Sequence, residues 1–144
     1  MSEMESAAAG SVPSPRLLVV GCGAIGSVVA ANLANLGANL TILSRNEAIA
    51  DAINARGVIV QGDSPLGRVD ASVVTTLEGN ERPFDAILLA VQPPQVEDAA
   101  RRVVGHLAHD GVLVCLQNGL CELRLTEIAG PERVVGAIVS WGAS

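Results

Sequence analysis

The sequence contains no lysine, so its nine basic residues are all arginines. With 15 acidic residues, the formal net charge is −6. So few cations argue against a nucleic-acid-binding surface. No apolar run approaches the roughly 20 residues that cross a bilayer as a helix, so we expect no membrane partner. The residues through Pro15 also lack the positive and long apolar segments of a secretory signal. We therefore expect a cytoplasmic protein.

Cysteine is also scarce. The three cysteines, Cys22, Cys115 and Cys121, form no Cys-x-x-Cys pair. An odd number without such a pair argues against a disulfide framework and against a zinc site. We interpret Cys22 as a small residue in a turn and Cys115 as a buried strand residue. Cys121 lies near a predicted helix start, where a thiol can be reactive, but a packing role is favoured.

The 144 residues suffice for one domain with a core. Residues 1–15, rich in Ser, Ala, Pro and Gly, are expected to form a disordered tail or leader, and residues 16–144 the domain. Hydrophobic spacing and Gly or Pro breaks predict alternating strands and helices there. The predicted strands are 16–20, 39–43, 58–61, 69–75, 86–91, 112–116 and 134–139, and the predicted helices are 24–36, 47–56, 94–107 and 122–129.

This alternation predicts an α/β fold, a Rossmann-type doubly wound, mainly parallel sheet with helices on both faces. Residues 86–91 are continuously apolar, which is typical of a central parallel strand. The segments 58–61 and 69–75 are expected to pair as a hairpin at the sheet edge. Ligands of such folds bind at the carboxyl ends of the strands. The predicted loops that converge there are 21–26, 91–95 and 117–120.

A glycine-rich turn, Gly21-Cys22-Gly23-Ala24-Ile25-Gly26, joins the first predicted strand to the first predicted helix. In a dinucleotide-binding turn the first glycine allows the tight bend and the second lets the backbone approach a pyrophosphate. The third lets the helix and strand pack closely. The helix that follows directs unpaired N–H groups at the phosphates. The full strand–turn–helix setting favours this interpretation over a chance turn.

The end of the second predicted strand distinguishes the two forms of the cofactor. NAD-binding domains usually place an acidic residue there for the ribose hydroxyls. Here the run is Leu43-Ser44-Arg45-Asn46, with no acid before Glu47. A guanidinium can form paired hydrogen bonds with a 2′-phosphate, which a carboxylate would repel. We therefore predict NADP(H) over NAD(H); the alternative for Arg45 is a solvated surface arginine.

Several motifs occur together in one order: the glycine turn, Arg45, Leu88-Leu89-Ala90-Val91-Gln92, Gln117-Asn118-Gly119-Leu120 and the last predicted strand. Over about residues 16–144 they resemble the N-terminal domain of the ketopantoate reductases, also called 2-dehydropantoate 2-reductases. The resemblance implies an oxidoreductase that uses NADPH to reduce the ketone of a small 2-oxo acid, in the pathway to pantothenate.

By position, the resemblance implies that Asn118 lies between the nicotinamide ribose and the substrate, where an amide can both donate and accept. The alternative is that Asn-Gly serves only as a turn. The cofactor is expected to be NADP(H). The expected cofactor-binding residues are Gly21, Cys22, Gly23, Ala24, Ile25, Gly26, Ser44, Arg45, Val91, Gln92 and Asn118, of which Asn118 is also expected to bind substrate.

Two departures from the family pattern concern substrate and catalysis. Gln92 stands where the family usually has a lysine, which leaves the identity of the 2-oxo acid open. Family members also carry a helical C-terminal domain that supplies a catalytic lysine and an acidic partner. This sequence has no lysine and ends at Ser144, where that domain would begin. We therefore expect no catalytic residue in this chain and no activity from it alone. The alternatives are an excised domain, a truncated gene product, or a module completed by a partner chain that supplies the helical domain; a homodimer is a further alternative.

Other polar or aromatic residues are interpreted as structural. His106 and His109 are expected at the end of a helix, away from the carboxyl ends of the strands, as surface or dipole partners. Asp85, Glu122 and Trp141 are likewise expected to be structural.

Two other functions compete with the reductase. A non-enzymatic dinucleotide-sensing regulatory domain needs no proton donor, but such domains normally keep an acid where this sequence has Arg45. A methyltransferase also needs a carboxylate for ribose hydroxyls, and the third glycine, Gly26, suits a pyrophosphate better.

Overall fold

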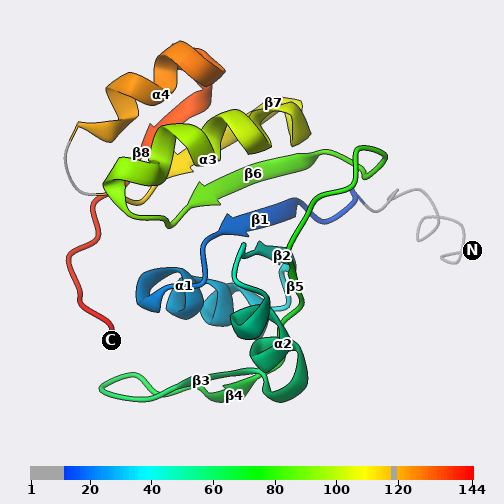
Figure 1. Ribbon diagram of the computed structural model, residues 1–144, viewed down its shortest axis with the longest axis vertical. Coiled ribbons are helices and arrows are strands. Elements are labelled where there is room, and N and C mark those ends of the chain that lie inside the picture. The colour runs from blue at the N-terminus through cyan, green and yellow to red at the C-terminus, as the bar shows by residue number, and fades with distance from the viewer. Residues whose placement is uncertain (1–11, 118–119) are drawn as a thin grey trace, which may run out of the picture.

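The computed structural model describes residues 12–117 and 120–144. Six parallel strands form one sheet, in the order β5-β2-β1-β6-β7-β8 (Figure 1). This α/β sheet confirms the predicted Rossmann-type fold. Its strands are β1 (Arg16–Val20), β2 (Asn39–Leu43), β5 (Val73–Val74), β6 (Phe84–Leu89), β7 (Leu107–Cys115) and β8 (Val134–Gly136). The helices are α1 (Ala24–Asn35), α2 (Glu47–Arg56), α3 (Val96–Val103) and α4 (Cys121–Ala129), with short 3-10 turns η1 (Pro93–Gln95), η2 (Val104–His106) and η3 (Pro131–Arg133).

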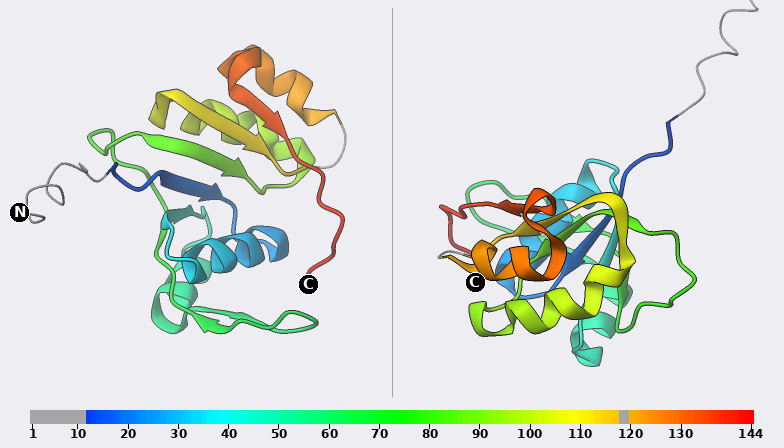
Figure 2. Two further views of the ribbon diagram at one scale, coloured as in Figure 1. Left: turned by 180° about the vertical axis from the view of Figure 1, so that it is seen from behind. Right: turned by 90° about the horizontal axis from the view of Figure 1, so that it is seen from above.

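Helices cover both faces of the sheet, as Figures 1 and 2 show. Successive side chains of β1 alternate between two cores. Leu18 and Val20 pack in the core formed with α3 and α4, whereas Val19 packs in the core formed with α1 and α2. Since side chains of a strand point to opposite faces in turn, a strand covered on both sides must be apolar throughout. This burial places β1 and β6 at the centre of the sheet and the glycine turn at its carboxyl edge.

The predicted edge hairpin is only partly correct. β3 (Val58–Val60) does pair antiparallel with β4 (Gly67–Val69), but the two form a separate sheet that packs on α1. The main sheet instead ends at β5, so the predicted strand 69–75 is divided in two. The side chain of Asn54, on α2, pairs with the outer side of the edge strand β5. Its Oδ1 accepts from the Val73 amide and its Nδ2 donates to the Val73 carbonyl, both at 2.8 Å. A side-chain amide thus occupies the open edge where a further strand would pair.

The second half of the chain differs from the prediction in its boundaries. α3 ends at Val103, and β7 begins at Leu107, earlier than the predicted 112. His109 therefore lies in a strand, not at a helix end. Gly111, which falls between the predicted helix 94–107 and the predicted strand 112–116, is buried within β7, where a Cβ atom would lie 3.0 Å from the Phe84 carbonyl oxygen. The register between β6 and β7 shifts at this point, so a glycine is needed for close packing.

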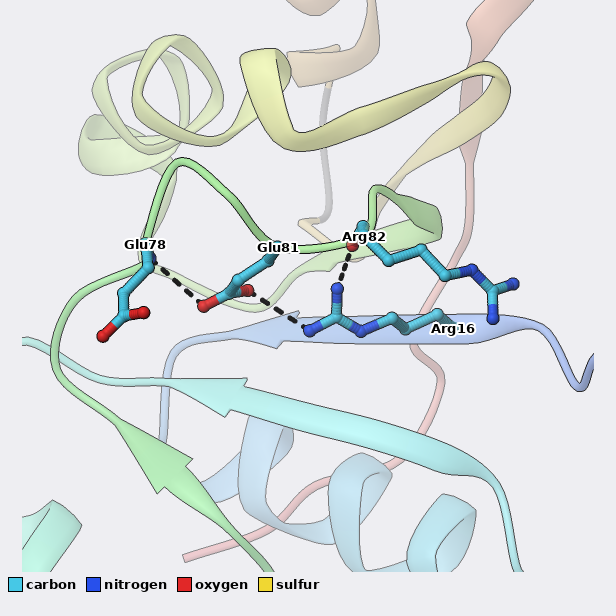
Figure 3. Close-up of polar contacts among 4 residues, drawn as sticks. All are labelled: Arg16, Glu78, Glu81 and Arg82. Atoms are coloured by element: carbon cyan, nitrogen blue, oxygen red, sulfur yellow. Dashed lines mark hydrogen bonds and ion pairs between the residues drawn. The ribbon is translucent and has the colours of Figure 1, made fainter.

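Arg16 holds together the amino ends of the central strands β1 and β6 (Figure 3). Its guanidinium lies 3.2 Å from the Glu81 carboxylate, donates to the Arg82 carbonyl and stacks 4.2 Å from the Phe84 ring centre. Its backbone amide donates to Asp85 at 2.7 Å, which agrees with the structural role predicted for that acid. The loop before β6 is thereby held to the start of β1, away from the carboxyl ends. Among the described residues, no helix is long and apolar enough to cross a membrane.

Candidate dinucleotide-binding site

The glycine turn between β1 and α1 has the backbone geometry that its sequence predicts. Gly21 has a φ of +107°, and a Cβ atom there would lie 2.8 Å from the Ala90 carbonyl oxygen. A Cβ on Gly26 would overlap the Gly21 carbonyl oxygen, so α1 can approach the turn only with glycine at this position. At Gly23, by contrast, a Cβ would meet no protein atom within 4 Å. The backbone at Gly23 therefore faces open space, as a phosphate-binding position requires.

The start of α1 is left open for an anion. In the described part of the chain no side chain caps α1 and no acidic residue lies in its first turn. The positive end of the helix dipole and its first amides consequently face the space beside Gly23. Ser27 braces the turn by donating from Oγ to the Cys22 carbonyl at 3.1 Å. Burial raises the pKa of the Cys22 thiol against a smaller lowering effect of Ser44, so this thiol brings no negative charge to the site at neutral pH.

Arg45 projects from a fixed backbone at the end of β2. The Ser44 amide donates to the Val74 carbonyl at 3.0 Å, and the Ser44 hydroxyl accepts from the Asn46 amide at 3.3 Å. Asn46 caps α2 by accepting from the Ile49 amide at 3.1 Å. Within this frame the Arg45 side chain is 61% exposed, and its guanidinium lies 3.8 Å from the Asp98 carboxylate. Arg45 is thus available to a ligand, but it is already paired with an acid that the sequence did not reveal.

Buried Gln117 connects the segments that follow β6 and β7. The Gln117 side chain, 7% exposed, donates from Nε2 to the carbonyls of Leu89 at 2.9 Å and Val91 at 2.7 Å. Its Oε1 accepts from the Cys115 thiol at 2.9 Å. These contacts join the end of β7 to the segment after β6. The sequence suggested only a turn here, because it does not show which carbonyls a glutamine will meet 26 residues away.

Two cavities lie at the carboxyl edge of the sheet, and they share a wall. The first encloses about 500 Å³ and the second about 380 Å³. Gly23, Ala90, Val91 and Gln92 line both, and we call these four residues the neck. The first cavity extends from the neck between the end of β2 and α3, past Leu43, Ser44, Arg45, Thr76, Leu77, Asp98, Arg102 and His106. The second extends to Ala24, Ile25, Pro93, Leu116, Gln117, Val139, Trp141 and Ala143.

The cavities bring together most of the residues expected to bind cofactor. The three predicted loops contribute to them, which agrees with the expected convergence. The first is lined by Gly21, Cys22, Gly23, Ser44, Arg45, Val91 and Gln92, and the second by Gly23, Ala24, Ile25, Val91 and Gln92. Gly26 lies beneath the turn, in contact with Gly21 and Ala90. Asn118 lies outside the described residues.

Other lining residues were not anticipated. His106 lines the first cavity, although it was expected to lie away from the site. Trp141, expected to be structural, is 45% exposed and lines the second cavity, because residues after β8 run back along the carboxyl edge (Figures 1 and 2). Asp98 and Arg102 lie on the α3 face that lines the first cavity. The signal for this face was present: residues 95, 98, 99, 102 and 106 recur at helical spacing.

Comparison with known proteins identifies the family. The sequence model described as "Ketopantoate reductase PanE/ApbA" matches residues 17–144. The chain belongs to the ketopantoate reductase family. A 2-dehydropantoate 2-reductase of Pyrococcus horikoshii is 33% identical over 129 residues, which span 89% of this chain and 40% of that relative. A relative in Methylorubrum populi named protein-L-isoaspartate O-methyltransferase is 36% identical over 131 residues, which span 84% of this chain and 54% of the relative. The chain thus spans about half or less of these relatives.

Solved structures share the fold. A 2-dehydropantoate 2-reductase from Enterococcus faecalis has a TM-score of 0.77 at 20% identity, covering 88% of this chain and 42% of that one. D-mandelate dehydrogenase, solved with NADH and anilino(oxo)acetate, has a TM-score of 0.75 at 18% identity, covering 85% and 40%. The chain is a NAD(P)-binding domain of the ketopantoate reductase type, and neither the comparisons nor the fold supports the non-enzymatic alternative.

Proposed function

We propose that this domain binds NADP(H) for the reduction of the ketone of a small 2-oxo acid. The observation that supports this most directly is the pair of cavities joined at the neck. A dinucleotide has two nucleosides joined by a pyrophosphate, and the neck includes the open backbone of Gly23 at the start of α1. We assign the pyrophosphate to the glycine turn, the adenosine to the first cavity with its 2′-phosphate on Arg45, and the nicotinamide to the second cavity.

The bound cofactor would supply a hydride to the ketone carbon. This chain's own residues hold and orient it: the turn binds phosphates, Gln117 fixes the segment that carries Gln92, and Trp141 forms a wall of the second cavity. Among the described residues that line the second cavity, none carries a titratable side chain. An alkoxide that develops in the second cavity therefore meets no general acid in this described lining. We propose that these 144 residues alone do not catalyse the reduction of a 2-oxo acid.

The substrate assignment rests on the family. Asn118 stays a predicted contact to ribose and substrate. A role in pantothenate synthesis, a cytoplasmic location, and a homodimer or partner chain that supplies the helical domain also stay predictions from the sequence.

Intrinsic fluorescence tests the cofactor assignment with little ambiguity. Trp141 is the sequence's one tryptophan, and the chain has no tyrosine. Reduced nicotinamide absorbs where tryptophan emits, so NADPH in the second cavity should quench Trp141 emission saturably, by energy transfer. Oxidised NADP should bind and reverse the quenching by competition. The absence of quenching and of calorimetric heat at millimolar NADPH would contradict the proposal.

A further inference from the structure

Three charged side chains meet on the wall of the first cavity. Arg45 comes from the loop after β2, and Asp98 and Arg102 come from α3. One carboxylate oxygen, Asp98 Oδ2, lies 3.8 Å from Arg45 and 3.1 Å from Arg102. The exposed fractions of the three side chains are 61%, 60% and 54%, so solvent reaches all of them and each can turn toward a ligand.

The neighbouring charges of α3 make different contacts. Arg101 pairs with Glu97 at 3.7 Å, and Glu97 also accepts from Arg124, on α4, at 2.8 Å. Neither Glu97 nor Arg101 lines the cavity. Residues 98 and 102 are four apart and share the face of α3 that lines it. The two adjacent ion pairs of one short helix therefore serve different surfaces, one facing the first cavity and one facing α4.

Two guanidiniums that share one carboxylate oxygen define a position where an anion can be held from two sides. A phosphate monoester carries a charge of about −1.5 to −2 at neutral pH and has three acceptor oxygens. It can therefore accept charge-assisted hydrogen bonds from both arginines on separate oxygens, whereas the 2′-hydroxyl of NAD(H) offers them one uncharged oxygen. A carboxylate beside the phosphate competes for the same donors and repels the phosphate. The same carboxylate can accept a hydrogen bond from a ribose hydroxyl.

We propose that Arg102 is a second arginine for the adenosine 2′-phosphate, and that Asp98 limits the preference for NADP(H) over NAD(H). This inference rests on the proposed function, because it requires the adenosine end in the first cavity. The sequence has no acidic residue at the end of β2, but Asp98, on α3, brings a carboxylate to the same part of the site. Arg45 and Arg102 favour the phosphorylated cofactor and Asp98 opposes them, so the ratio of the two affinities depends on all three residues.

The test compares Arg102→Gln and Asp98→Asn with the matched controls Arg101→Gln and Glu97→Gln. Dissociation constants for NADPH and NADH come from Trp141 emission, and those for 2′,5′-ADP and 5′-AMP, which differ by the 2′-phosphate alone, from calorimetry. Arg102→Gln should weaken NADPH and 2′,5′-ADP about tenfold and change NADH and 5′-AMP less than about twofold. Asp98→Asn should tighten NADPH about threefold and leave NADH unchanged or weaker. Both controls should leave the NADPH-to-NADH ratio within about twofold of wild type.

The results separate this inference from the proposed function. If wild-type protein binds neither NADPH nor NADH, the proposed function itself fails. If wild type binds both, but Arg102→Gln and Asp98→Asn leave the ratio of their affinities unchanged, only the inference is wrong. Parallel losses for 2′,5′-ADP and 5′-AMP would also overturn it, since they would indicate a general effect on α3. Thermal midpoints equal to wild type for all four variants would show that the measured ratios come from folded protein.

Discussion

Replacement of Gly23 by alanine should separate cofactor binding from folding. Gly23 has a φ of −69°, which alanine adopts without strain, and its Cβ would meet no protein atom within 4 Å. An alanine that fits also reduces the entropy of the unfolded chain, so the free energy of unfolding should rise by about 0.4–1 kcal/mol or stay unchanged. The added methyl group would nevertheless occupy the space that we assign to the pyrophosphate.

The expected loss of binding follows from hydrogen-bond geometry. A phosphate oxygen held by the first amides of α1 lies about 2.7–2.9 Å from a backbone nitrogen, and a Cβ beside it removes that approach. Loss of one charge-assisted bond costs about 1.5–3 kcal/mol, which corresponds to an increase of about 10- to 140-fold in the dissociation constant for NADPH. Urea unfolding and Trp141 quenching measure the two quantities separately.

Controls decide how this result is interpreted. Gly105→Ala is matched, because its Cβ would also meet nothing within 4 Å and Gly105 does not line either cavity; it should leave binding unchanged. Gly26→Ala should instead destabilise the fold, since its Cβ would overlap the Gly21 carbonyl oxygen. If Gly23→Ala binds NADPH as tightly as wild type, the pyrophosphate does not lie at this turn and the assignment of the neck is wrong.

Further predictions concern the cofactor form, the buried amide and the thiols. Arg45→Asp should weaken NADPH by about 1–3 kcal/mol and NADH less, and equal losses in calorimetry would contradict the 2′-phosphate assignment. Gln117→Met removes the hydrogen bonds to the Leu89 and Val91 carbonyls, at 2.9 and 2.7 Å, and the bond from the Cys115 thiol. Urea unfolding should therefore show a loss of about 1–3 kcal/mol, whereas exposed Gln61→Met should change little. Because burial raises the pKa of the Cys22 and Cys115 thiols and the chain has no Lys or Tyr, the free energy of unfolding should stay level up to about pH 8.5 and fall above it. The free energy of unfolding falls because, as the pH rises, the thiols of Cys22 and Cys115 lose their protons in the unfolded chain before they do so in the folded one. The double variant Cys22→Ser/Cys115→Ala should therefore show a smaller fall between pH 7 and pH 10.

The first half of the fold could be predicted from the sequence because its signals are local. The predicted bounds of β1, β2 and α2 agree with the structure. Asn46 caps the start of α2, and Gly57, with a φ of +73°, ends it. The glycine turn is equally local, since the tight bend, the open backbone and the close packing all lie within six residues.

The structure differs where the decisive contact is distant in sequence. Asn54 determines where the sheet ends through hydrogen bonds to a residue 19 positions away. Gln117 donates to carbonyls 26 and 28 positions away, and the Asp98 carboxylate lies 3.8 Å from Arg45, 53 positions away. Periodicity predicted a helix at 94–107, and its spacing places residues 98 and 102 on one face. It does not indicate what that face will meet, so the role of these two residues in the site became clear only from the fold.

The two cavities differ in charge, and this difference bears on the proposed reaction. The described lining of the first includes Arg45, Asp98, Arg102 and His106, whereas that of the second has no titratable side chain. Gln92, at the neck, can donate a hydrogen bond but brings no charge where the family usually has a lysine. In the proposed assignment, the backbone of the glycine turn holds the pyrophosphate, charged side chains meet the 2′-phosphate, and the redox end lies in the cavity whose described lining carries no charge. A 2-oxo acid in the second cavity would need its carboxylate and its developing alkoxide neutralised by groups outside this lining, so the choice of substrate depends on those groups more than on the cofactor-binding residues.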